Sequence, residues 1–60
     1  MELADRVDLI NAYYTLEMYE VYEDMVEDAA RDTGRTYGEM EDLVTDVRLG
    51  YVDLRTGLSD

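Results

Sequence analysis

The apolar residues of the first thirty positions recur at helical spacing, and this pattern constrains the fold more than any other feature of the chain. They follow steps of three and four residues: Leu3, Val7, Ile10, Tyr14, Met18, Val21, Met25 and Ala29. At ~100° per residue these positions fall on one stripe, which is typical of an amphipathic helix. No proline or glycine precedes Gly34, and glycine readily takes the left-handed conformation that ends a helix. The sequence therefore predicts one long helix over residues 1–30, about 40 Å in length.

A second, shorter helix is indicated after Thr36. Thr36 and Glu39 have the spacing of a capping box, and Gly50 is a second stop signal. Between them, apolar residues again recur at helical spacing: Tyr37, Met40, Leu43, Val44 and Val47. Residues 51–60 fit a short strand or an extended tail that packs Tyr51, Val52 and Leu54. We therefore expect one all-α domain over residues 1–60, a helical hairpin of one long and one shorter helix with a short extended C-terminal tail.

The length of the chain points to an additional source of stability. A chain of 60 residues buries only about 60% of its unfolded surface, so small domains usually add disulfides, a metal or a partner subunit. Cysteine and histidine are both absent, which excludes disulfides and removes the usual zinc ligands. We therefore expect the domain to be packed as a homodimer or in a hetero-complex with a partner.

The residue types leave little room for catalysis or cofactor binding. Cysteine, histidine and lysine are missing, and the single serine is Ser59. A calcium loop centred on Gly34 or Gly38 would begin at Ala29 or Thr33, where an acid is required. No glycine-rich phosphate loop occurs. The sequence therefore predicts no enzyme activity, no cofactor and no metal, and the lack of a long apolar run or signal peptide favours a soluble, cytoplasmic protein.

Negative charge is concentrated in one segment. The chain has a formal charge of −11, and seven of its 16 acidic residues lie between positions 17 and 32. On a helix, six of them share an arc of about 140°, with Arg31 as the local counter-ion. Such a face repels nucleic acid and anionic membranes and attracts basic proteins. The alternatives are a solvated helix face and the general acidity of a salt-adapted host. The predicted partner-binding acids are Glu17, Glu20, Glu23, Asp24, Glu27 and Asp28.

Tyrosine is the second notable feature, because all six aromatic residues are tyrosines. Tyr14 and Tyr22 fall on or beside the main apolar stripe and are predicted to be core residues. Tyr13 and Tyr19 do not, and on the opposite side they form a second apolar patch with Leu9, Ala12 and Leu16. Tyrosine is enriched at binding hot spots. Two interpretations stay open for Tyr13 and Tyr19, namely packing inside a dimer and contact with a target.

In charge and size the chain resembles the small acidic proteins of phages and mobile elements. Some of those proteins act as DNA mimics that block a CRISPR effector, a restriction enzyme or a uracil-DNA glycosylase. The resemblance implies an inhibitor that binds a basic nucleic-acid-binding enzyme and does not bind nucleic acid directly, in the cytoplasm of the host cell if phage-encoded. Two alternatives remain: an antitoxin or adaptor that neutralises a basic protein, and a structural helical-bundle component of a salt-adapted organism.

Overall fold

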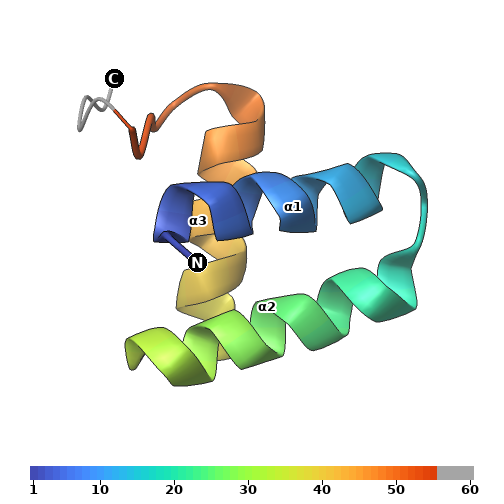
Figure 1. Ribbon diagram of the computed structural model, residues 1–60, viewed down its shortest axis with the longest axis horizontal. Coiled ribbons are helices and arrows are strands. Elements are labelled where there is room, and N and C mark those ends of the chain that lie inside the picture. Colours follow the sequence, from blue (N-terminus) through green and yellow to red (C-terminus); the bar gives the residue numbers. More distant parts are fainter. Residues whose placement is uncertain (56–60) are drawn as a thin grey trace.

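The computed structural model describes residues 1–55, and this part of the chain is built from three helices. They are α1 (Leu3–Thr15), α2 (Tyr19–Thr33) and α3 (Tyr37–Leu49), and residues 1–55 contain no strand. α1 and α2 run antiparallel, and α3 crosses them (Figure 1). The predicted all-α class is confirmed. The predicted two-helix hairpin is wrong, because the expected long helix is two helices joined by a turn at residues 16–18.

Each of these helices ends in a Schellman motif, in which a backbone N–H bonds to a carbonyl five residues earlier. One residue in each motif is left-handed: Glu17 (φ 62°) after α1, Gly34 (φ 72°) after α2 and Gly50 (φ 85°) after α3. The stop signals at the two glycines are confirmed. The stop after α1 carries no glycine, so no local signal in the sequence indicates it.

The turn at Glu17 costs conformational energy at that residue, but it allows the chain as a whole to bury more apolar surface. A non-glycine residue in the left-handed conformation costs about 1–2 kcal/mol. A straight helix over residues 1–30 would have only α3 to cover its long apolar stripe. The turn lets α1 fold back on α2, so that both helices bury apolar surface against each other and against α3.

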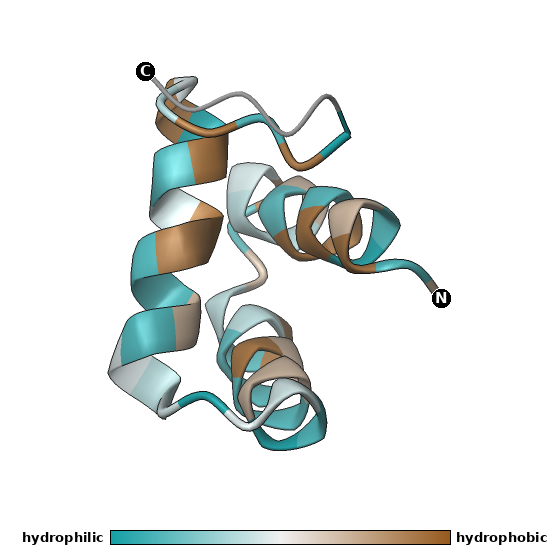
Figure 2. Cartoon of the chain, turned by 90° about the vertical axis from the view of Figure 1, so that its left-hand side faces the viewer, coloured by the Kyte–Doolittle hydropathy of each residue, from teal (hydrophilic) through white to brown (hydrophobic). Residues whose placement is uncertain are grey.

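The turn also changes which residues of α2 face the core. Val7, Ile10 and Ala29 of the predicted stripe are buried, but Met18 and Val21 are 43% and 37% exposed. The prediction that these two belong to the core is wrong, because α2 starts with a new phase after the turn. Figure 2 shows hydrophobic colouring mainly where the helices face one another. The core consists of Val7, Ile10, Tyr22, Val26, Ala29, Ala30, Met40 and Val44.

The start of α3 is fixed by the predicted capping box. The Thr36 hydroxyl accepts a hydrogen bond from the Glu39 N–H at 3.1 Å, and the Glu39 carboxylate accepts one from the Thr36 N–H at 2.9 Å. The carboxylate is stabilised chiefly by that backbone donor, which lowers the pKa of Glu39. Two otherwise unpaired donors of the first turn are thereby satisfied.

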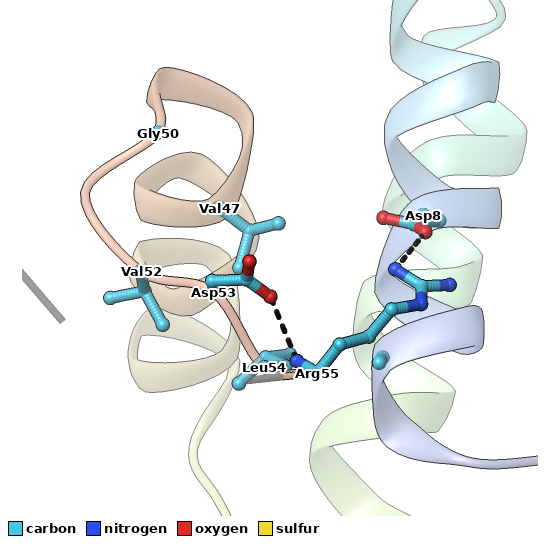
Figure 3. Close-up of a pocket in the computed structure, with 8 residues that line it drawn as sticks. Asp8, Val47, Gly50, Val52, Asp53, Leu54 and Arg55 are labelled. Carbon is cyan, nitrogen blue, oxygen red and sulfur yellow. Dashed lines mark hydrogen bonds and ion pairs between the residues drawn. The ribbon is translucent and has the colours of Figure 1, made fainter. Parts of the chain in front are cut away.

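The C-terminal segment 51–55 returns along α1. Leu54 packs against the core and Val52 is partly buried, as predicted, whereas Tyr51 is exposed and that part of the prediction is wrong. The Arg55 guanidinium reaches Asp5 at 2.7 Å and Asp8 at 2.6 Å. Figure 3 shows the contact with Asp8. The remainder of the predicted tail, 56–60, lies outside the described residues.

Candidate partner-binding surface

The acidic residues of α2 lie on the side of the helix opposite its buried face. At ~100° per residue, they span about 140° of arc, while the buried positions of α2 centre roughly 145° away. The helix is held from behind by the core, so the exposed carboxylates project from a fixed support. The exposed acids on this face, which we call the α2 acidic face, are Glu20, Glu23, Asp24, Glu27 and Asp28.

Little positive charge offsets the α2 acidic face. Arg31 lies 3.5 Å from Glu27 and 3.3 Å from Asp28, at the C-terminal end of the face. Within residues 1–55, no salt bridge joins Glu20, Glu23 or Asp24 to an arginine. The N-terminal half of the face therefore retains its full negative charge.

The other arginines with salt bridges in the described part of the chain bind acids away from this face. Arg6 of α1 pairs with Asp32 at 2.7 Å and links the start of α1 to the end of α2. Arg55 pairs with Asp5 and Asp8, and these hydrogen bonds raise its pKa. The fold thus uses scarce positive charge to join its segments and leaves the middle of α2 uncompensated.

Glu17 does not belong to the helical face with which it was predicted. It is the left-handed residue of the α1–α2 turn and is exposed. Its neighbours in the turn, Leu16 and Met18, are exposed as well. Glu17 therefore adds a carboxylate just before the N-terminus of α2, beside apolar side chains, rather than on the axis of the α2 acidic face.

The two tyrosines predicted for partner contact have different environments. Contact of Tyr13 with a partner stays a prediction; the side chain is half-buried and packs in part against the core rather than lying wholly in an outward patch. The reason is that α1 contacts both α2 and α3 and therefore buries a wider arc than a hairpin would. Tyr19 is 50% exposed at the first position of α2. The remaining members of the predicted patch, Leu9, Ala12 and Leu16, are exposed.

Tyr14 of α1 contacts aromatic or cationic groups from both other helices. Its ring makes edge-to-face pairs with Tyr19 at 5.6 Å and Tyr22 at 5.3 Å between centroids. The Arg48 guanidinium of α3 stacks 3.8 Å from the centre of the same ring. Tyr14 thus fixes the position of Tyr19 at the surface. The prediction of Tyr14 and Tyr22 as core residues is confirmed, with Tyr22 buried and Tyr14 partly buried.

A polar link between α1 and α3 supports this cluster and was not predicted from the sequence. The Asn11 amide donates to the Val44 carbonyl at 3.2 Å, and its oxygen accepts from Arg48 at 3.2 Å. The partners are more than thirty residues apart. No local pattern could have indicated a pairing that exists only once α3 has crossed α1.

Two depressions lie at opposite ends of α1. The first, with a volume of about 300 Å³, lies between the start of α1, the end of α3 and segment 51–55 (Figure 3). Its charged side chains bond within the chain: Arg55 to Asp8, and Asp53 to the Arg55 N–H at 2.9 Å. The second is shallow and open, lies at the α1–α2 turn, and is lined by Glu17, Met18, Tyr19, Glu20 and Val21.

Three further properties of the described part of the chain bear on what this surface can do. Within residues 1–55, no three acidic side chains converge closely enough to hold a metal ion. Tyr37 lies near the acids Glu41 and Glu23; burial, followed by these negative charges, raises the pKa of its phenol. No helix in the described part of the chain combines the length and the apolar character needed to span a bilayer.

Comparison with known proteins identifies no relative: no protein-family model, curated protein or solved structure matches this chain. The principal feature of the surface is the α2 acidic face with the neighbouring turn.

Proposed function

We propose that this protein is a non-enzymatic binding protein that inhibits a basic nucleic-acid-binding enzyme by occupying its nucleic-acid groove. The observation that carries the proposal is the α2 acidic face, where Glu20, Glu23 and Asp24 have no arginine partner within residues 1–55. Like charges at these spacings destabilise a helix. A fold that keeps them together, while Arg6, Arg31 and Arg55 bind other acids, maintains a strong local negative field.

The geometry of α2 suits a groove that normally holds a phosphate backbone. Successive acids on the face rise by about 5 Å along the helix axis, against about 3.4 Å per phosphate along one DNA strand. The match is coarse, so the proposal rests on the line of charge rather than on atom-by-atom mimicry. The field would steer association with a positive groove, and the occupied groove would exclude DNA or RNA.

The chemistry of the partner follows from this surface. It is a protein with a groove lined by lysine and arginine, such as a CRISPR effector, a restriction enzyme or a uracil-DNA glycosylase. The protein itself, with its net charge of −11, does not bind nucleic acid or anionic membranes. We further propose a cytoplasmic location, where such enzymes act.

The test is a displacement assay with these three enzymes as probes. Each enzyme, bound to labelled duplex DNA, is titrated with the protein at salt concentrations from about 50 mM to about 500 mM. We expect displacement that weakens as salt rises. Replacement of Glu20 and Glu27 by lysine should weaken binding by at least about tenfold.

The matched control reverses two exposed acids elsewhere. Glu2→Lys with Asp42→Lys changes net charge by the same amount but leaves the α2 acidic face intact. We expect it to bind nearly as well as the wild type. Affinity that is independent of salt, or equal losses in both double variants, would refute a function located on α2.

The same assay separates the alternative functions. An antitoxin or adaptor would bind a basic protein without competing with its nucleic acid. A bundle component of a salt-adapted organism would need molar salt to fold, which a thermal melt at low and at multimolar salt measures directly.

A further inference from the structure

The α1–α2 turn exposes a group of apolar side chains next to the α2 acidic face. Met18 is 43% exposed, Tyr19 50% and Val21 37%, and together with Glu17 and Glu20 they line the shallow depression of about 460 Å³ at this corner. We call this group the corner pocket. Leu16, at 66% exposure, extends its apolar rim.

The corner pocket is exposed because of the tertiary structure. Met18 and Val21 lie on the apolar stripe of the sequence, and the left-handed Glu17 turn brings Tyr22 and Val26 into the core in their place. Tyr19 is held at the rim by its ring contact with Tyr14. The pocket therefore offers apolar area on a pre-organised support, which lowers the entropy lost on binding.

The charges around the pocket define what can cover it. Glu17 and Glu20 form part of its lining, and Glu23 and Asp24 continue the negative charge along α2. A second copy of this chain pairing across its own corner would bring these carboxylates close to their symmetry mates, which is unfavourable. An occupant that carries apolar side chains flanked by arginine or lysine satisfies both parts of the surface.

We propose that the corner pocket binds a basic amphipathic segment of the partner protein. Its apolar side chains enter among Met18, Tyr19 and Val21, and its basic side chains pair with Glu17 and Glu20. The proposal rests on the proposed function, which it deepens by naming an apolar anchor beside the electrostatic contact. The acidic face supplies attraction, and the pocket fixes where along α2 the basic surface docks.

The test uses two synthetic helical peptides of equal length and equal lysine content. One carries leucines along one face, and the other carries serines at those positions. Binding to the full chain is measured by calorimetry at low and at high salt. We expect the leucine peptide to bind about tenfold more tightly, because burying most of one aliphatic side chain has about this effect. The leucine advantage should persist at high salt.

Variants of the protein show which residues cause the preference for the leucine peptide. Met18→Ser with Val21→Ser should abolish the preference for leucine, while the matched control, Leu9→Ser with Leu49→Ser, removes exposed leucines elsewhere and should retain it. Chemical-shift mapping on the wild-type protein gives a second readout, with the largest changes expected at Met18, Tyr19 and Val21.

The outcomes separate the two proposals. Equal affinity of the wild type for both peptides, a leucine preference that survives in the serine variant, or shift changes centred elsewhere would overturn the corner pocket. The serine peptide tests the electrostatic function separately. If its binding responds neither to salt nor to Glu20→Lys with Glu27→Lys, the proposed function fails whatever the leucine peptide does.

Discussion

Replacement of Asp24 by lysine should stabilise the fold and weaken partner binding at the same time. Asp24 is exposed near the middle of α2, past the first turn, and is four residues from Glu20, three from Glu27 and four from Asp28. It therefore takes part in three like-charge pairs at helical neighbour spacing. A lysine there turns all three repulsions into attractions.

The size of the effect follows from these pairs. Each like-charge pair destabilises a helix by about 0.2–0.5 kcal/mol, and each opposite-charge pair stabilises it by a similar amount. Two of the neighbours, Glu27 and Asp28, are already engaged by Arg31, and all the groups face solvent, so full additivity does not apply. We expect the free energy of unfolding to rise by about 1 kcal/mol at low salt. For a domain of this size that corresponds to about 4–8 °C in Tm.

The assay is a pair of measurements on one variant. Thermal unfolding at low and at about 1 M salt should show the gain and its loss through screening. The displacement assay should show weaker binding of the same protein. Asp42→Lys is the matched control, since it places a lysine near two acids of α3, Glu39 and Asp46, without touching α2.

Two results would refute the reasoning at different points. If Asp24→Lys is not more stable than the wild type at low salt, the like-charge strain on α2 is absent. If it is more stable and still binds as tightly as Asp42→Lys, the acids form a solvated face and the functional proposal is wrong.

The remaining predictions concern the fold that supports this surface. Glu17→Gly should raise the free energy of unfolding by about 1 kcal/mol in urea titrations, because glycine adopts the left-handed conformation without strain; an unchanged midpoint would contradict this. Thr36→Ala should lower it by about 1 kcal/mol through loss of the N-cap. The folded pKa of Glu39 lies below its ordinary value of 4.5, so its stabilising effect is complete above about that pH and is lost as pH falls through the folded pKa. The difference in free energy of unfolding between the wild type and Glu39→Gln, measured against pH, should therefore shrink below pH 4.5. A difference that stays constant with pH would show that protonation of Glu39 is not coupled to unfolding. Tyr14→Leu should cost about 2 kcal/mol, since it removes two ring pairs and a stacked guanidinium, whereas Tyr51→Leu, at an exposed ring, should cost little in the same thermal melts.

Local signals in the sequence correctly located three of the six helix ends in residues 1–55. Gly34 and Gly50 end α2 and α3, and Thr36 with Glu39 begins α3, because caps and left-handed glycines act within a few residues. The failure came at residues 16–18, where the chain turns through a glutamate. Periodicity could not reveal this turn, since the apolar steps continue through it without interruption.

The candidate surface also has features that local sequence predicts and features that only tertiary contacts determine. The outward position of the acids on α2 follows from helical periodicity and can be predicted from the sequence. The exposure of Met18 and Val21, the inward packing of Tyr13, and the link from Asn11 to Arg48 depend on how α1 and α3 lie against α2. These features appear only when segments distant in sequence come into contact.

The sequence by itself determined that this chain is helical, where α2 and α3 end, and that one helical face carries a dense negative charge. These are properties of neighbours within one or two turns, and helix geometry converts them directly into positions. The tertiary structure decided that the first thirty residues form two helices. It did so because the apolar surface buried when α1 folds back on α2 stabilises the fold by more free energy than the left-handed Glu17 costs. By the same step it exposed Met18, Tyr19 and Val21 beside the acids, and so created the corner pocket.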